Sequence, residues 1–91
     1  MELKWTSKAL SDLARLYDFL VLASKPAAAR TVQSLTQAPV ILLTHPRMGE
    51  QLFQFDPREV RRIFAGEYEI RYELTGQTVY VLRLWHTRES R

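Results

Sequence analysis

Cysteine is absent from this sequence, and its absence removes several kinds of chemistry together. Without a thiol the chain can form no disulfide, hold no cysteine-ligated zinc ion and use no thiolate nucleophile. The composition suits a reducing compartment, and we expect the protein to lie in the cytoplasm. No apolar run of about 18 residues occurs, and the first residues are too polar for a secretory signal, so we expect no membrane contact.

Histidine and glycine are scarce. The two histidines, His45 and His86, lack the spacing of paired metal ligands. The three glycines are scattered and form neither a phosphate-binding loop nor the elbow around a nucleophilic serine. We therefore expect no metal site, no cofactor and no hydrolase triad.

What the sequence does contain is enough for one domain with a hydrophobic core. It is 46% hydrophobic, with two Trp, four Tyr and four Phe, so we expect a single domain over residues 1–91. The net charge is +3, and ten of the 13 basic residues are arginine. The planar guanidinium suits carboxylates and phosphates, so two interpretations stay open: an anionic partner and an ordinary ion-paired surface.

The first half of the sequence predicts a short strand and two helices. Residues 2–5 fit a strand, and Thr6 or Ser7 can cap the helix that follows. One face of that helix carries apolar residues at spacings of three and four, namely Leu10, Leu13, Tyr17 and Leu20. Pro26 suits the first turn of a second helix, and Pro39 should break it.

The first helix has more apolar side chains than its inward face can use. Its polar residues, among them Asp12, fall mostly on the side opposite the main stripe. Apolar residues that widen the stripe or form a second apolar side include Leu16, Phe19, Leu20 and Leu22. A domain of this size has little surface with which to cover a helix all round, so these four are candidates for contact with a partner.

The second half predicts a sheet. The expected strands span residues 58–65, 67–74 and 79–86. Turns at Gly66 and Gly76 join them, and an extended segment over residues 52–55 precedes them. The expected fold is α+β, with an N-terminal strand and a helical hairpin packed on one face of a small antiparallel meander sheet.

Charged residues lie on the strands as well as at their ends. The middle strand carries three of them on one face: Glu69, Arg71 and Glu73. Simple alternation in the last strand groups four residues on one face: Val79, Val81, Arg83 and Trp85. An arginine with such neighbours usually pairs with a carboxylate, and Glu69 and Glu73 are the expected partners of Arg83. A cross-strand ion-pair ladder and a phosphate-binding cluster both fit this pattern.

Two sets of candidate site residues follow. Tryptophan and arginine are favoured where proteins bind proteins, which makes the C-terminal segment a candidate surface. Together with the strand arginines, the candidates for contact with a target are Arg58, Arg71, Arg83, Trp85, His86 and Arg88. RNA cleavage without a metal needs cations around the phosphate and a side chain that moves a proton. If the chain is a nuclease, the residues expected to do this are His86, Arg71 and Arg83.

Several short motifs stand in a fixed order along nearly the whole chain. In the first half they are Trp5, Asp12-Leu13, Tyr17-Asp18-Phe19-Leu20 and Pro26-Ala27-Ala28-Ala29. In the second half they are Pro46-Arg47-Met48-Gly49, Arg58-Glu59-Val60-Arg61, Tyr68-Glu69-Ile70-Arg71-Tyr72 and Leu82-Arg83-Leu84-Trp85-His86-Thr87-Arg88. Each motif is weak alone, but the ordered set resembles the ParE-like toxins of the RelE/ParE superfamily of type II toxin–antitoxin systems.

The resemblance implies a fold, a partner and a location. The family fold is the helical hairpin on an antiparallel sheet already expected from the residues. The resemblance implies a bacterial cytoplasmic toxin with an operon-encoded antitoxin, often one with a ribbon-helix-helix DNA-binding part. In the family the C-terminal segment of the antitoxin packs on the helices of the toxin. The candidates for antitoxin binding are therefore Leu16, Phe19, Leu20 and Leu22.

The resemblance also implies two alternative targets. RelE-like members cut mRNA on the ribosome with Arg, Lys and a late Tyr or His, whereas ParE-like members inhibit DNA gyrase. Where nuclease members carry an arginine in the middle strand, this sequence has Glu69, whose charge would repel phosphate. We therefore expect a non-enzymatic inhibitor of gyrase. The alternatives are a ribosome-dependent endonuclease that uses His86, and an inert protein that only binds its antitoxin.

Overall fold

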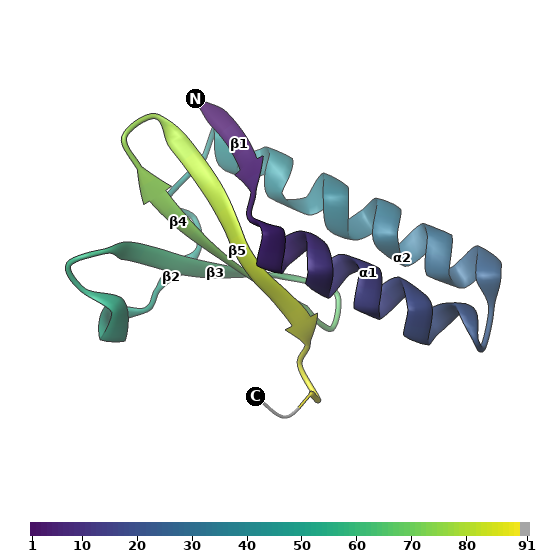
Figure 1. The fold of residues 1–91 in the computed structure, drawn as a ribbon. Coiled ribbons are helices and arrows are strands. Elements are labelled where there is room, and N and C mark those ends of the chain that lie inside the picture. Colours follow the sequence, from purple (N-terminus) through teal and green to yellow (C-terminus); the bar gives the residue numbers. More distant parts are fainter. Residues whose placement is uncertain (90–91) are drawn as a thin grey trace.

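The computed structural model describes residues 1–89, which form a five-stranded sheet with a helical hairpin on one face (Figure 1). The elements in chain order are β1 (Glu2–Trp5), α1 (Ser7–Val21), α2 (Lys25–Gln37), the 3-10 helix η1 (Ala38–Leu43), β2 (Glu50–Gln51), the 3-10 helix η2 (Phe53–Phe55), β3 (Glu59–Ala65), β4 (Tyr68–Thr75) and β5 (Thr78–His86). The two long helices lie side by side, and their connected end extends beyond the sheet (Figure 1). The predicted α+β fold is confirmed.

The sheet has the strand order β1-β5-β4-β3-β2. Strands β3, β4 and β5 form the predicted antiparallel meander, with Gly66 and Gly76 at positive φ in its two turns. Strand β1 pairs parallel to β5, with Glu2 opposite Thr78, so the sheet as a whole is mixed. This pairing makes β5 an internal strand, with β1 on one side and β4 on the other.

The segment before the meander differs from its prediction. Residues 52–55 were expected to be extended, but Phe53–Phe55 form the 3-10 turn η2. The strand at this edge is the preceding pair Glu50–Gln51, which lies opposite Arg62 and Arg61 of β3. The hydrophobic run misled the prediction because a short apolar segment fits a strand and a turn equally well.

Helix α1 begins as predicted but buries a different face. The Oγ1 of Thr6 accepts a hydrogen bond from the backbone N–H of Ala9 at 3.1 Å, which caps the helix. The buried residues of α1 are Ala9, Asp12 and Leu16, whereas Leu10 is 52% exposed. The inward position of Leu10 and the outward position of Asp12 were therefore predicted wrongly. Both errors have one cause, a specific bond between Asp12 and β5 that hydrophobic periodicity does not register.

Helix α2 follows its sequence signals at both ends. The Oγ of Ser24 accepts a hydrogen bond from the N–H of Ala27 at 3.2 Å, and Pro26 lies in the first turn. The helix ends at Gln37, and the buried Pro39 lies in η1, which continues the chain as a tighter helix. The predicted break at Pro39 is confirmed.

The core lies between the helices and the sheet. One buried cluster comprises Ala9, Leu16, Leu35, Ile70, Val81 and Leu84. A second comprises Leu42, Tyr72 and Val79 and extends under η1. None of the helices within residues 1–89 is long and apolar enough to cross a membrane.

Strand β5 contains an irregularity that changes which side chains share a face. Arg71 lies opposite Arg83, but the next residue, Tyr72, lies opposite Val81, so Leu82 is an extra residue in β5. The hydroxyl of Thr6 donates to the carbonyl oxygen of Leu82 at 3.0 Å at this point. Arg83 therefore lies on the face of the sheet away from the core.

The grouping expected from simple alternation is accordingly wrong. Val79 and Val81 lie in the core clusters beneath the helices, whereas Arg83 and Trp85 lie on the opposite, open face. A period of two holds only while the two strands keep a constant register, and one inserted residue reverses it.

Candidate functional site

Arginines on the open face of the sheet are paired with glutamates. The shortest N···O distances are 2.8 Å for Arg58–Glu73, 3.5 Å for Arg62–Glu69 and 3.2 Å for Arg71–Glu69. Glu69 is only 2% exposed, so two guanidinium groups neutralise a buried carboxylate. The hydrogen bond from Arg58 lowers the pKa of Glu73 below its usual value. Of the two patterns that the sequence left open, these contacts match the ion-pair ladder, although Arg83 is not part of it.

Arg71 lies between two aromatic rings. Its guanidinium carbon is 5.3 Å from the centroid of the Phe55 ring and 4.8 Å from that of the Trp85 ring. Trp85 is 5% exposed. Trp85, a candidate for contact with a target, is therefore largely covered in this chain, where the guanidinium groups of Arg71 and Arg83 lie over its ring.

Arg83 is paired, but not with the glutamates of β4. Its Nε and Nη2 donate to the two carboxylate oxygens of Asp12 at 2.7 and 3.1 Å. The N–H of Leu84 donates to the same carboxylate at 3.0 Å, just beyond the end of the β1–β5 pairing. Burial would raise the pKa of Asp12, but these hydrogen bonds and the charges of Arg83 and Arg15 lower it. The sequence predicted a carboxylate partner for Arg83, but that partner is Asp12 and not Glu69 or Glu73.

His86 lies on the other side of β5 from these arginines. It is opposite Tyr68 in the sheet, and the two rings meet edge to face with centroids 5.1 Å apart. Its Nδ1 accepts a hydrogen bond from the N–H of Arg88 at 3.1 Å, and its Nε2 lies 3.6 Å from Glu67. The three candidate nuclease residues are therefore not brought together, since Arg71 and Arg83 occupy the opposite face.

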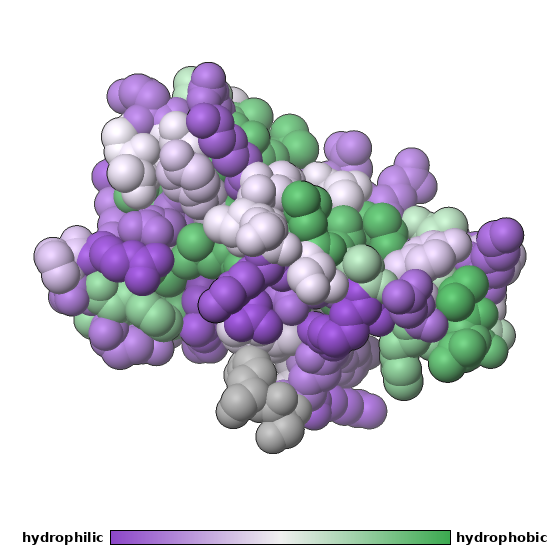
Figure 2. All heavy atoms as spheres, in the orientation of Figure 1, coloured by the Kyte–Doolittle hydropathy of each residue, from purple (hydrophilic) through white to green (hydrophobic). Residues whose placement is uncertain are grey.

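A groove of about 960 Å³ runs beside α1. Its lining includes Arg15, Leu16, Phe19 and Leu20 from the helix and Tyr68, His86 and Arg88 from the sheet and the segment after it. Phe19 is 71% exposed, and Leu22, just beyond the helix, is 85% exposed. Figure 2 shows hydrophobic surface over the end of the helical hairpin that extends past the sheet.

Three of the four antitoxin candidates thus line this groove, but the prediction that Leu16 is available for contact needs correction. Leu16 is buried in the main core cluster, so it forms part of the groove floor and is not a free contact residue. The remaining two groove residues, Phe19 and Leu20, together with Leu22, form the accessible apolar part of α1.

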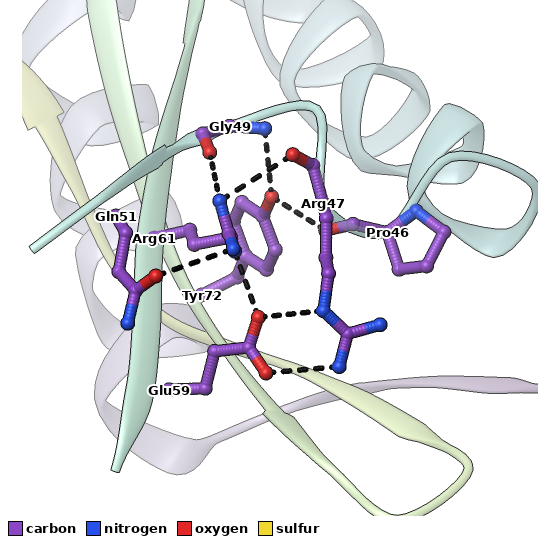
Figure 3. Close-up of polar contacts among 7 residues, drawn as sticks. All are labelled: Pro46, Arg47, Gly49, Gln51, Glu59, Arg61 and Tyr72. Atoms are coloured by element: carbon purple, nitrogen blue, oxygen red, sulfur yellow. Dashed lines mark hydrogen bonds and ion pairs between the residues drawn. The ribbon is translucent and has the colours of Figure 1, made fainter. Parts of the chain in front are cut away.

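The loop over residues 46–49 is held by a polar network that the sequence did not reveal (Figure 3). The Oη of the buried Tyr72 donates to the carbonyl oxygen of Pro46 at 2.8 Å and accepts from the N–H of Gly49 at 3.1 Å. Nη1 of Arg61 donates to the carbonyl oxygens of Gly49 at 2.8 Å and Arg47 at 3.4 Å. Every carbonyl or N–H bonded here belongs to the loop backbone, so its path is fixed from the sheet.

Two further features tighten the same loop. Nε and Nη2 of Arg47 donate to the two carboxylate oxygens of Glu59 at 2.9 and 3.0 Å. A Cβ on Gly49 would lie 2.6 Å from the carbonyl oxygen of Arg62 and 2.6 Å from the Oη of Tyr72. Only glycine therefore allows this close approach of the loop to β3. The sequence signal that could have indicated it is the motif Pro46-Arg47-Met48-Gly49 itself.

Comparison with known proteins agrees with the geometry. A family model described as ParE toxin of the type II toxin–antitoxin system parDE matches residues 3–91. The chain belongs to the ParE toxin family. Toxin RelE1 of Caulobacter vibrioides is 36% identical to it over 85 residues, which covers 92% of this chain and 90% of that toxin.

A solved structure supports the same assignment. A chain from the chromosomal ParDE toxin–antitoxin system of P. aeruginosa matches this ParE-family toxin with a TM-score of 0.79 and 27% identity. The match covers 94% of this chain and 95% of that chain. The protein is thus a type II toxin of the RelE/ParE superfamily, and membership of that family implies a cognate antitoxin.

Proposed function

We propose that this ParE-family toxin acts by binding and inhibiting DNA gyrase. The observation that carries the proposal is the separation of His86, on one face of β5, from Arg71 and Arg83 on the other. RNA cleavage needs the proton-transferring group and the phosphate ligands within about 3 Å of the same reacting atoms. Both arginines are also paired, Arg71 with Glu69 and Arg83 with Asp12. These features favour a binding surface over an acid–base centre.

Purified toxin tests the proposal directly. At micromolar concentration it should block DNA supercoiling by gyrase or trap cleaved DNA, and equimolar antitoxin should restore the activity. The variant Leu10→Ala is the matched control, because Leu10 is exposed on α1 and lies outside the candidate target residues, so it should inhibit gyrase as well as the wild type does. Full gyrase activity in the presence of a micromolar excess of folded toxin would falsify the proposal.

The name of the Caulobacter relative, Toxin RelE1, favours a second candidate function, that of a ribosome-dependent mRNA endonuclease. In that case His86 would move the proton, and Arg71 or Arg83 would bind the phosphate. Mapping 5′ ends in ribosome-bound mRNA decides between the two functions. New ends made by the wild type and lost in His86→Ala would replace the gyrase proposal, and their absence would remove the nuclease.

An inert, antitoxin-binding member of the family is the third candidate. Expression of the chain without its antitoxin separates it from both toxic functions. Growth arrest that co-expressed antitoxin relieves indicates an active toxin, whereas unimpaired growth indicates the inert member.

We further propose that the antitoxin, carrying a ribbon-helix-helix DNA-binding part, seats an apolar segment in the groove beside α1. Phe19 and Leu20 line that groove, and the exposed Leu22 extends it toward the end of the hairpin. A few well-packed anchors, with aromatic side chains prominent among them, supply most of the affinity of a protein interface. On this proposal the toxin acts in the bacterial cytoplasm, where it would meet both gyrase and the antitoxin.

A further inference from the structure

The loop over residues 46–49 is more rigidly built than packing requires. Tyr72 and Arg61 together bond the backbone of three of its four residues, and Gly49 brings it into direct contact with β3. Burial raises the pKa of Tyr72, so its hydroxyl stays protonated and able to donate to the loop. Yet the side chain at the tip of the loop, Met48, is 58% exposed and buries little itself.

The arginines around the tip are paired, although the Arg47 side chain is itself 66% exposed. Arg47 directs its guanidinium at both carboxylate oxygens of Glu59, and Arg61 donates its Nε to the same carboxylate at 2.9 Å. Arg61 is largely covered by the loop, with 15% of its side chain exposed. The loop therefore exposes the apolar thioether of Met48 beside an arginine, Arg47, whose guanidinium is already bonded to Glu59.

We infer that this loop is a target-contact element, in which Met48 enters an apolar pocket on the surface of the protein that the toxin inhibits. A loop whose backbone is fixed before binding avoids most of the entropy cost of ordering it on the target. Methionine suits such a role because its flexible, polarisable side chain fits pockets of irregular shape. Because Arg47 is already bonded to Glu59, the tip fits a protein pocket better than a phosphate backbone.

The loop and the antitoxin groove are separate surfaces. The loop is bonded to β3 and β4 near the β2 edge of the sheet, whereas the groove lies beside α1, which packs on β5. None of the loop residues lines the groove. A change at Met48 should therefore alter inhibition of the target and leave antitoxin binding unchanged, which lets one set of variants measure both.

The inference rests on the proposed function, with gyrase as the target, and the experiment separates the two. The variants are Met48→Lys, Met48→Ala and the conservative Met48→Leu, with Leu10→Lys as the matched control because Leu10 is similarly exposed on α1. For each, the toxin concentration that halves supercoiling, the Kd for antitoxin and the melting temperature are measured. The melting temperature and the antitoxin Kd show that a variant is folded.

Met48→Lys should raise the half-inhibitory concentration at least tenfold and Met48→Ala about threefold to tenfold, whereas Met48→Leu and Leu10→Lys should stay within twofold. The antitoxin Kd should change less than twofold in all four. Inhibition of gyrase by Met48→Lys at the wild-type concentration would overturn the inference and leave the proposed function standing.

If the wild type does not inhibit gyrase, growth arrest on expression of the toxin and its variants tests the inference. If the wild type arrests growth without inhibiting gyrase, the proposed function fails, and the loop is tested by whether Met48→Lys abolishes arrest while Leu10→Lys does not. Equal arrest by Met48→Lys overturns the inference. If the wild type does not arrest growth at all, both statements fail, because a chain without a target has no target-contact loop.

Discussion

The buried carboxylate of Asp12 links α1 to β5. One buried carboxylate accepts two hydrogen bonds from the Arg83 side chain and one from the N–H of Leu84. It thereby provides an acceptor for a backbone N–H of β5 beyond the point where β1 stops pairing, and it fixes the rotation of α1 about its axis. A backbone N–H left unbonded at such a place costs about 1–3 kcal/mol, which explains why a charged residue lies in this position.

Replacing Asp12 by alanine should lower the free energy of unfolding by about 2–4 kcal/mol, because Arg83 and the N–H of Leu84 both lose their acceptor. Asp18→Asn is the matched control, since Asp18 is exposed on the same helix, and its effect should stay within about 0.5 kcal/mol. Urea titrations followed by circular dichroism measure both values. Equal stability of the two variants would contradict the role given to Asp12.

The same carboxylate should make stability depend on pH. The pKa of Asp12 is lowered in the folded chain, so its contribution is fully present above the unfolded pKa of about 3.9 and is lost as pH falls through the folded pKa. The difference in unfolding free energy between wild type and Asp12→Asn should therefore shrink as pH falls below about 4. Urea titrations at several pH values test this, and a difference that is constant down to pH 2 would rule it out.

At the scale of elements, α1 has two apolar surfaces with different roles. Leu16 packs against the sheet, whereas Phe19 and Leu22 face solvent beside the groove. The heptad-like spacing of the sequence identified an amphipathic helix but placed its inward face incorrectly, with Leu10 inside. The correct rotation depends on Asp12 and the small Ala9, and neither contributes to hydrophobic periodicity.

The two surfaces of α1 should respond in opposite ways to alanine. Phe19→Ala should weaken antitoxin binding by roughly tenfold to a hundredfold with little change in melting temperature. Leu16→Ala should instead cost about 2–5 kcal/mol of stability, because it opens a cavity in the core. Leu10→Ala, on a different face of the same helix, is the control for both. Calorimetric titration and thermal melts separate the effects, and wild-type affinity in Phe19→Ala would exclude this groove as the antitoxin site.

The strands of the meander show the same difference between local sequence signals and contacts over long sequence distances. Alternating residues and glycine turns placed β3, β4 and β5 correctly, because each signal is local to a hairpin. The extra residue Leu82 and the parallel pairing of β1 involve partners far away in the sequence, so they left no local signal. The inserted residue alone separates Arg83 from Val79 and Val81, with which simple alternation had grouped it, and puts it on the open face.

For the whole molecule, a chain of 91 residues has a small stability margin that a bound antitoxin should increase. With free antitoxin at about 100 times its Kd, linkage adds about 2.7 kcal/mol, which corresponds to roughly 10 °C or more in Tm for a domain of this size. Differential scanning calorimetry of the toxin with increasing antitoxin measures the shift. A Tm independent of antitoxin concentration would argue against binding to the folded toxin.

The sequence by itself determined the class of fold, the caps and breaks of the helices, the antiparallel meander and the superfamily. All of these depend on short-range chemistry or on motifs that stand in order along the chain. Only the tertiary structure decided which side chains meet: Asp12 with Arg83, Tyr72 with the loop over residues 46–49, and His86 apart from Arg71. Those encounters depend on strand register and helix rotation, which are set by contacts between residues distant in the sequence.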